Sequence, residues 1–308
     1  MRANFFELLK EEMKNDKSLF LIIADQGLGL IEAIQEEFPD RFINVGIAEQ
    51  NMIGVAAGLC NVGFRPFCYT ISNFLTERSF EQIRNDICFH KYPITLIGAS
   101  TGFDNGKLGP THQIIDDIGC IKVLPNMNIY SPCSIKSISM IFEEIIKNKE
   151  PAYVRIGKGS YDIEPIEDNI NHMVVKSDNS DILVITHGTV LKNCVEAAKI
   201  DNNFSIFCMN KIKPLDKEKI KELFEKYSKI VVVEDHFVTS GLYNSLCQCL
   251  VEMQLQKTRL YSIGTPEKYE NIVGDRDYFA DRYGYSSLKI SQFVSKIYGK
   301  SYNYNSNL

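Results

Sequence analysis

Short apolar runs alternate with helix-like patterns along most of this 308-residue chain, and this rhythm restricts the fold more than any other feature. In the first half, the predicted strands are 18–24, 42–46, 66–71, 93–99, 129–131 and 152–156, and the predicted helices are 51–61, 74–90 and 134–149. Segment 93–99 is almost continuously apolar, as is typical of a parallel strand with both faces buried. The alternation predicts an α/β fold in which helices cover both faces of a mostly parallel sheet.

A polar segment, 159–180, interrupts this rhythm and is predicted to be a linker, because it carries Gly159, Pro165 and several Asn and Asp residues. The rhythm then resumes, with predicted strands at 181–186, 205–209, 229–233 and 259–263 and predicted helices at 190–199, 216–226, 241–253 and 286–298. We therefore expect two three-layer αβα domains, 1–158 and 181–308.

Composition argues against several classes of protein. The net charge of −5 gives no electrostatic reason to expect nucleic acid as a partner. No run approaches the roughly 18 apolar residues of a membrane span, and the N-terminus lacks the apolar core of a signal peptide. The nine cysteines form no Cys-x-x-Cys pair, so we interpret them as reduced core residues of a cytoplasmic protein.

A carboxylate stands where a predicted strand ends. The stretch Val45-Gly46-Ile47-Ala48-Glu49 leads from an apolar run into a helix of small residues. Ligands of open α/β sheets bind at the carboxyl ends of the strands. The neighbours of Glu49 are apolar, so its carboxyl group should be poorly solvated, and such a group can hold or pass a proton near neutral pH. An ordinary glutamate at a helix start would give the same pattern.

A second motif, Gly109-Pro110-Thr111-His112-Gln113, follows strand 93–99 in a glycine-rich loop. With the upstream segment 46–50 it resembles the transketolase family of thiamin-diphosphate enzymes, of which 1-deoxyxylulose-5-phosphate synthase is a close relative. Weaker similarities at 69–86, 123–127, 151–155 and 231–242 occur in family order, so the resemblance covers nearly the whole chain. It implies a pyrimidine-binding domain at 1–158 and a transketolase C-terminal domain at 181–308.

The resemblance also implies cofactor contacts. The family glutamate that matches Glu49 contacts a ring nitrogen of the aminopyrimidine of thiamin diphosphate and drives the tautomer that activates the cofactor. An aromatic side chain from segment 69–80 should stack on the pyrimidine. Phe74 is the first choice, with Tyr69 and the motif residue Ile47 as further cofactor contacts. The alternative for Phe74 is plain core packing.

Four residues are expected on the substrate side by the same resemblance. His112 matches a family histidine that faces the substrate, although a loop histidine bonded to backbone is the alternative. Arg155 ends a strand where relatives place a phosphate-binding arginine. An interdomain or surface ion pair would suit it as well. Asp25 matches an acidic position near the partner interface, and Ser100 stands where the family has a histidine.

The chain lacks the Gly-Asp-Gly motif with which transketolases hold a divalent ion and the cofactor diphosphate. Its nearest string, at 273–277, lacks the second glycine. We therefore predict one subunit of a split enzyme that has no metal ligands of its own. An N-terminal transketolase subunit should hold the diphosphate and magnesium or calcium. Self-association into an α2β2 assembly is expected through helix 51–63 and the helix start at 240–241.

Two substrate positions depart from the family. Transketolases carry Asp where this chain has Leu108, and His where it has Ser100. Both family residues bind hydroxyl groups of the ketose donor, so their loss predicts a changed donor specificity. The alternative is that Asp104, in the same loop, substitutes for the missing carboxylate.

Transfer of a two-carbon ketol unit between sugar or sugar-phosphate substrates is the leading functional hypothesis. The beta subunit of a 2-oxoacid dehydrogenase shares the glutamate and the domain order, but its loop does not usually read Gly-Pro-Thr-His-Gln. A deoxysugar synthase acting on pyruvate and a non-catalytic regulatory subunit are further alternatives. Intact Glu49 and His112 argue against the last of these. His187 and His236 are expected to be structural.

Overall fold

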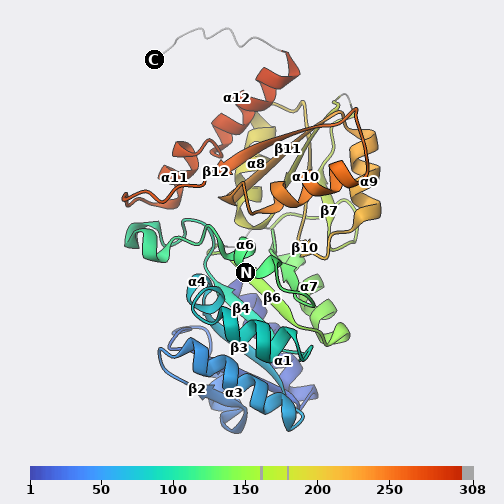
Figure 1. Cartoon of the computed structure of the whole chain (residues 1–308). Helices are drawn as coiled ribbons and strands as arrows, with labels where there is room; N and C mark the ends of the chain where they lie inside the picture. The colour runs from blue at the N-terminus through green and yellow to red at the C-terminus, as the bar shows by residue number, and fades with distance from the viewer. Residues whose placement is uncertain (160–161, 179, 300–308) are drawn as a thin grey trace.

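A computed structural model describes residues 1–159, 162–178 and 180–299, and these form two sheets, each covered by helices on both faces (Figure 1). The first sheet contains, in spatial order, β10 (Lys211–Lys213), β5 (Asn128–Tyr130), β6 (Ala152–Ile156), β4 (Thr95–Ala99), β3 (Arg65–Ile71), β1 (Leu19–Ile23) and β2 (Phe42–Asn44). The second contains β12 (Arg259–Thr265), β11 (Lys229–Phe237), β8 (Ile182–Thr186), β9 (Ser205–Cys208) and β7 (His172–Val175). The predicted α/β fold is confirmed.

The helices follow from amphipathic patterns. In α7 (Ile135–Asn148), Ile138, Ile141 and Ile145 recur on one face, and the Ser134 side chain caps the first turn by accepting from the Ser137 N–H at 3.2 Å. The other α-helices are α1 (Arg2–Asn15), α2 (Glu32–Glu37), α3 (Glu49–Asn61), α4 (Ser72–Thr76), α5 (Phe80–Gln82), α6 (Asp117–Lys122), α8 (Leu191–Ile200), α9 (Lys217–Lys226), α10 (Leu242–Glu252), α11 (Arg276–Arg282) and α12 (Ser287–Tyr298). Among the described helices, none combines the length and apolar character that a membrane crossing requires.

Each sheet has two packed faces. In the first sheet, α1 and α7 cover one face and α3 covers the other. In the second, α8 and α12 lie on one face and α9 and α10 on the other. Because β1 to β6 run parallel, their carboxyl ends meet at one edge of the first sheet. The loops that carry the predicted site residues leave from that edge.

One strand from the second half of the chain belongs to the first sheet. β10 belongs to the second half but pairs antiparallel with β5 at the edge of the first sheet. The segment predicted as a linker contains β7, which pairs antiparallel with β9 at the edge of the second sheet. The N-terminus also lies where the halves meet, and its ammonium donates to the Gly159 carbonyl at 3.3 Å. The predicted linker is therefore partly a strand of the second sheet, and β10 joins the second half of the chain to the first sheet.

Local structure differs from the prediction at several places. The helix expected at 74–90 is interrupted: α4 ends at Thr76, α5 begins at Phe80, and a π-helix, Ile83–Cys88, follows. The strand predicted at 229–233 continues to Phe237 as β11. The short helices α2, α6 and α11 were not predicted, because six or seven residues do not show a full helical period. The last nine positions of predicted domain 181–308 lie outside the described residues.

Candidate active site

The candidate site forms where β2 and β3 end. Glu49 is the first residue of α3, and its side chain is buried, with the residue only 1% exposed. Phe74 lies on α4, which follows β3 directly. The strand order places β2 and β3 on either side of β1, so the two helix starts face the same edge. The predicted poorly solvated position of Glu49 is what the structure shows.

Four side chains make a continuous set of contacts, which we call the Glu49 cluster: Glu49, Phe74, Arg78 and His112. An Arg78 Nη1 atom lies 2.5 Å from Glu49 Oε2. The guanidinium of Arg78 also lies over the Phe74 ring, 4.5 Å from its centroid. The edge of the Phe74 ring meets the His112 imidazole, with the centroids 5.2 Å apart. The structure thus brings together Glu49, Phe74 and His112, as the sequence predicts.

His112 is held by its own loop. It ends a 3₁₀ turn, Pro110–His112, that follows Gly109, whose φ of +82° favours glycine. The Thr111 hydroxyl bonds the His112 Nδ1 atom at 2.9 Å, and the Asn73 side chain donates to the Thr111 carbonyl at 2.8 Å. The imidazole is therefore oriented by a side chain rather than by backbone, and Asn73 ties its loop to α4.

One flat nitrogen-bearing group, the guanidinium of Arg78, contacts both Glu49 and Phe74. The guanidinium of Arg78 is planar, donates to a buried carboxylate and lies against an aromatic ring. These are the two contacts that a planar heterocycle with a protonated ring nitrogen would make. The geometry therefore shows that Glu49 and Phe74 can be contacted by a single planar group at the same time.

Two predicted site residues have other roles. Tyr69 is buried in the core, and its ring packs edge-on against Phe6 of α1, with the ring centroids 4.8 Å apart. Alternation along β3 directs Tyr69 to the face that α1 covers, so it does not reach the Glu49 cluster. Arg155 is fully buried, and its guanidinium bonds Asp117, Asp235 and the Ile114 carbonyl. The expectation of a phosphate-binding arginine gives way to the interdomain ion pair named as its alternative.

The remaining predicted residues lie at the same edge of the sheet. Ile47 is 75% exposed, and Asp25 is also exposed, with its N–H donating to the Asn44 side chain at 3.1 Å. Ser100 is buried and adopts a φ of +74°, and its carbonyl accepts from the Ser72 hydroxyl at 2.8 Å. None of these contacts assigns a ligand, so the substrate and cofactor roles of these residues remain predictions.

Leu108, which stands where the family has an aspartate, is 62% exposed. Asp104 is not available to replace the missing carboxylate, because its own is almost fully buried. Its Oδ2 atom accepts from the Thr101 N–H at 3.0 Å and from the Lys158 N–H at 2.7 Å. Burial raises the pKa of Asp104, whereas Arg276 opposes that shift.

Sequence reasoning missed Arg78 and Asn73. Arg78 is four residues after Phe74, a spacing that places two side chains on the same face of a helix. That spacing was visible within the predicted helix 74–90. Asn73 had no comparable signal, because its partner carbonyl lies 38 residues away in the sequence.

Comparison with known proteins identifies the family of both domains. Residues 1–164 match the family model "Transketolase, pyrimidine binding domain", and residues 171–275 match "Transketolase, C-terminal domain". The chain is 30% identical over 304 residues to a putative transketolase C-terminal section of Methanocaldococcus jannaschii, covering 96% of this chain and 95% of that protein.

Two further similarities span most of the chain. One of the subunits of apulose-4-phosphate transketolase from Phocaeicola vulgatus is 28% identical over 281 residues, which is 88% of each chain. A solved structure described as a split gene transketolase in an inactive beta4 tetramer superposes with a TM-score of 0.81 at 26% identity, covering 96% of both chains. With the pyrimidine-binding model matching more than half of its residues, the chain belongs to the transketolase family.

Proposed function

We propose that this chain is the C-terminal subunit of a split, thiamin-diphosphate-dependent transketolase that transfers a two-carbon ketol unit between sugar phosphates. The observation that carries the proposal is the Glu49 cluster, in which Arg78 joins a buried carboxylate to an aromatic ring that a histidine contacts, at the carboxyl edge of a parallel sheet. The two relatives described as a transketolase C-terminal section and as a transketolase subunit support the split organisation.

The cluster fits the aminopyrimidine of thiamin diphosphate. That heterocycle is planar and carries ring nitrogens, and Arg78 already presents a planar nitrogen group to Glu49 and Phe74 together. When bound, the cofactor would supply the nucleophilic carbon that transfer of a two-carbon unit requires. We assign Glu49 to the ring nitrogen and Phe74 to the pyrimidine face.

The chain's own residues then have distinct tasks. Glu49 holds and returns a proton at the ring nitrogen, in a buried position that limits competition from water. Phe74 fixes the plane of the heterocycle. His112 contacts that ring in a T-shaped arrangement and is oriented by Thr111, so we assign it to the reacting end of the substrate. Arg78 must leave Glu49 for the aminopyrimidine to approach, because it contacts both binding groups.

A second polypeptide should complete the site. The family models account for a pyrimidine-binding and a C-terminal domain. Within the described residues, no group of three or more His, Cys, Asp or Glu side chains is placed to hold a metal ion. We assign the diphosphate and its magnesium or calcium ion to an N-terminal transketolase subunit, in an α2β2 assembly.

Calorimetry tests this division of the site. The isolated chain with magnesium and thiamin diphosphate should bind weakly and show no turnover, because it offers the pyrimidine contacts without the diphosphate contacts. Adding the purified partner subunit should give tight binding and ketol transfer between sugar phosphates. Tight binding by the isolated chain would contradict the split site. Turnover of pyruvate in place of a ketose donor would instead identify a deoxysugar synthase or a 2-oxoacid dehydrogenase component.

Leu108 should determine donor preference. An exposed leucine in the substrate loop offers no acceptor to a donor hydroxyl. We expect poor use of xylulose 5-phosphate by the wild-type enzyme and improvement in Leu108→Asp. One additional hydrogen bond to the donor corresponds to roughly 1–3 kcal/mol, or about 5- to 150-fold in kcat/KM. A panel of donors with and without that hydroxyl measures the difference.

The control for this prediction is Val273→Asp, which places the same charge on another exposed apolar residue, beside Gly109. Improvement confined to Leu108→Asp would assign the effect to the donor hydroxyl rather than to loop charge. A wild-type enzyme that prefers xylulose 5-phosphate, and is unaffected by Leu108→Asp, would refute the specificity argument.

A further inference from the structure

Residues 101–115, which we call the His112 loop, lie between the two domains. Among the hydrogen bonds that tie this loop to the C-terminal domain, three go to main-chain groups of that domain. The Phe237 N–H, at the end of β11, donates to the Ile115 carbonyl at 2.8 Å. The Gln113 side chain donates to the Ile272 carbonyl at 3.3 Å. The Gly274 N–H donates to the Gly106 carbonyl at 3.4 Å.

An aromatic stack fixes the opposite end of the loop. Phe103 lies parallel to Phe279 of α11, with centroids 4.0 Å apart and an interplanar angle of 15°. Both side chains are almost completely buried. The stack therefore holds the loop against the C-terminal domain through dispersion and shape, in addition to the hydrogen bonds.

At two glycines, the loop lies too close to the C-terminal domain for any residue with a side chain. Gly102 has a φ of +48°, and a Cβ atom there would lie 2.4 Å from the Asp235 carboxylate. At Gly106, a Cβ atom would lie 2.6 Å from the Gly274 carbonyl oxygen. At these two glycines, the main chain of the loop packs directly onto a buried acid and onto the main chain of the other domain.

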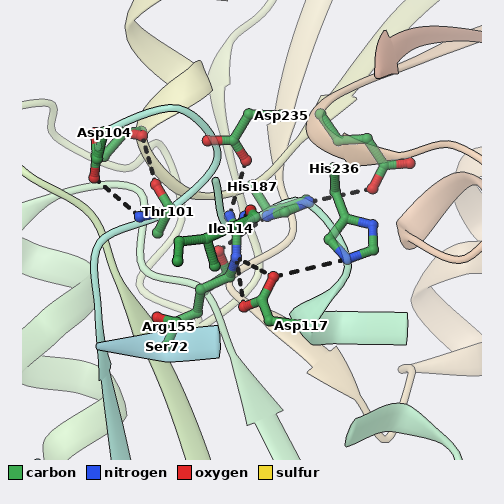
Figure 2. A network of polar contacts seen from close by, with 12 residues as sticks. Ser72, Thr101, Asp104, Ile114, Asp117, Arg155, His187, Asp235 and His236 are labelled. Atoms are coloured by element: carbon green, nitrogen blue, oxygen red, sulfur yellow. Dashed lines mark hydrogen bonds and ion pairs between the residues drawn. The ribbon is translucent and has the colours of Figure 1, made fainter. Parts of the chain in front are cut away.

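One guanidinium joins the loop to both domains (Figure 2). Arg155, on β6, donates through Nη2 to the Ile114 carbonyl at 2.8 Å. Its Nε atom bonds Asp117 of α6 at 2.8 Å, and its Nη1 atom bonds Asp235 of β11 at 2.8 Å. Because Arg155 and both acids are buried, this arrangement is weakly screened and strongly directional.

From these contacts we infer that the C-terminal domain is the positioning element of the His112 loop. Phe279 and the main chain at 237, 272 and 274 set where His112 stands against Phe74. The domain thereby acts on the reaction through the loop. This inference rests on the proposed function for its catalytic consequence, whereas the fixing of the loop is a property of the chain alone.

Small displacements of this loop matter because His112 contacts the ring that receives the cofactor. A misplacement of 1 Å at a reacting group can cost about 10²-fold in rate. Cofactor contacts come from Glu49 and Phe74, which stand on α3 and α4 rather than on the loop. Loosening the loop should therefore lower kcat and leave cofactor affinity nearly unchanged.

Two variants test the inference, one in the C-terminal domain and one in the loop. Phe279→Leu removes the ring that stacks on Phe103, and Gln113→Met removes the bond to the Ile272 carbonyl with little change in volume. Phe224→Leu is the matched control. It makes the same change on α9, against the other face of the second sheet. If Phe279→Leu fails to fold, Gln113→Met still decides the outcome.

Hydrogen exchange of the full-length isolated chain is the first measurement. The Ile114 N–H is protected by the Gly102 carbonyl and the His112 N–H by the Gly109 carbonyl, so both report on the loop. We expect exchange at 101–115 to be roughly tenfold faster in Phe279→Leu and Gln113→Met than in wild type, and unchanged in Phe224→Leu. Equal exchange in Phe279→Leu, Gln113→Met and Phe224→Leu would overturn the inference.

Kinetics of the enzyme reconstituted with its partner is the second measurement. We expect kcat to fall about tenfold or more in both loop variants, with the Kd for thiamin diphosphate within about twofold of wild type. A looser loop with unchanged kcat would refute the positioning role. If the wild-type pair shows no turnover at all, the proposed function fails, and the exchange measurement still decides whether the C-terminal domain fixes the loop.

Discussion

Glu49→Gln is expected to lower turnover of the reconstituted enzyme by about 10²–10⁴-fold while leaving folding and assembly intact. Glutamine has nearly the shape of glutamate, and the side chain stays buried at the start of α3. The amide cannot hold and return a proton at the cofactor ring nitrogen. Steady-state turnover and size-exclusion chromatography of the two-subunit complex measure activity and assembly separately.

Arg78→Gln is the matched comparison, because it also removes the ion pair with Glu49 but keeps the carboxylate. It should retain most of the activity and bind thiamin diphosphate at least as tightly as wild type, since Arg78 competes for Glu49 and Phe74. Equal losses in the two variants would assign the effect to the ion pair. Near-wild-type turnover of Glu49→Gln would show that Glu49 is not the activating residue.

Arg155→Met should produce the largest loss of stability. Removing one partner of a buried ion pair costs about 3–5 kcal/mol, and here Asp117 and Asp235 would both lose their counter-charge. We expect the melting temperature of the isolated chain to fall by roughly 5–15 °C. Arg65→Met is the comparison, because its partner Asp16 is partly exposed and should tolerate the loss better.

The loss should depend on pH. Burial acts to raise the pKa of Asp235, but Arg155, Arg276 and His187 together hold it below the ordinary value of 3.8. A lowered pKa in the folded state adds stability that is complete above about pH 4 and disappears as the pH falls through the folded value. Without Arg155, burial dominates and the protonated acid is favoured. The gap in melting temperature between wild type and Arg155→Met should therefore narrow as the pH falls, and a constant gap would contradict this origin.

The strands that sequence alone predicted are those with their own hydrophobic signal. β1 is a continuous apolar run and β3 and β4 are mostly apolar, and each forms within one or two residues of its predicted bounds. β7 and β10 are short and partly polar, and they exist because β9 and β5 offer an edge to pair with. Such strands depend on tertiary context, which a local pattern does not carry.

Site residues also divide into those with a local sequence signal and those that depend on tertiary context. Glu49 and His112 stand in distinctive local motifs, and the structure places both in the cluster. Arg155 stands at the end of a predicted strand. Its local sequence would be the same whether the side chain bound a phosphate or buried acids. Its acidic partners are 38 and 80 residues distant in the sequence. Tyr69 could have been assigned to the core only if α1 were already known to cover that face of the sheet.

The placement of β10 constrains how this chain can be recombined. A chimera joined within 159–180 would combine one parent's pyrimidine-binding sheet with an edge strand from the other parent, because Lys211–Lys213 pairs with Asn128–Tyr130. Expressing residues 1–158 alone would leave the edge of β5 open to pairing with other chains, a known route to aggregation. Exchange of domains within this family should therefore succeed only when the segment around 211–213 and the first domain come from the same parent. The part of the chain that must be transferred intact is not continuous in the sequence.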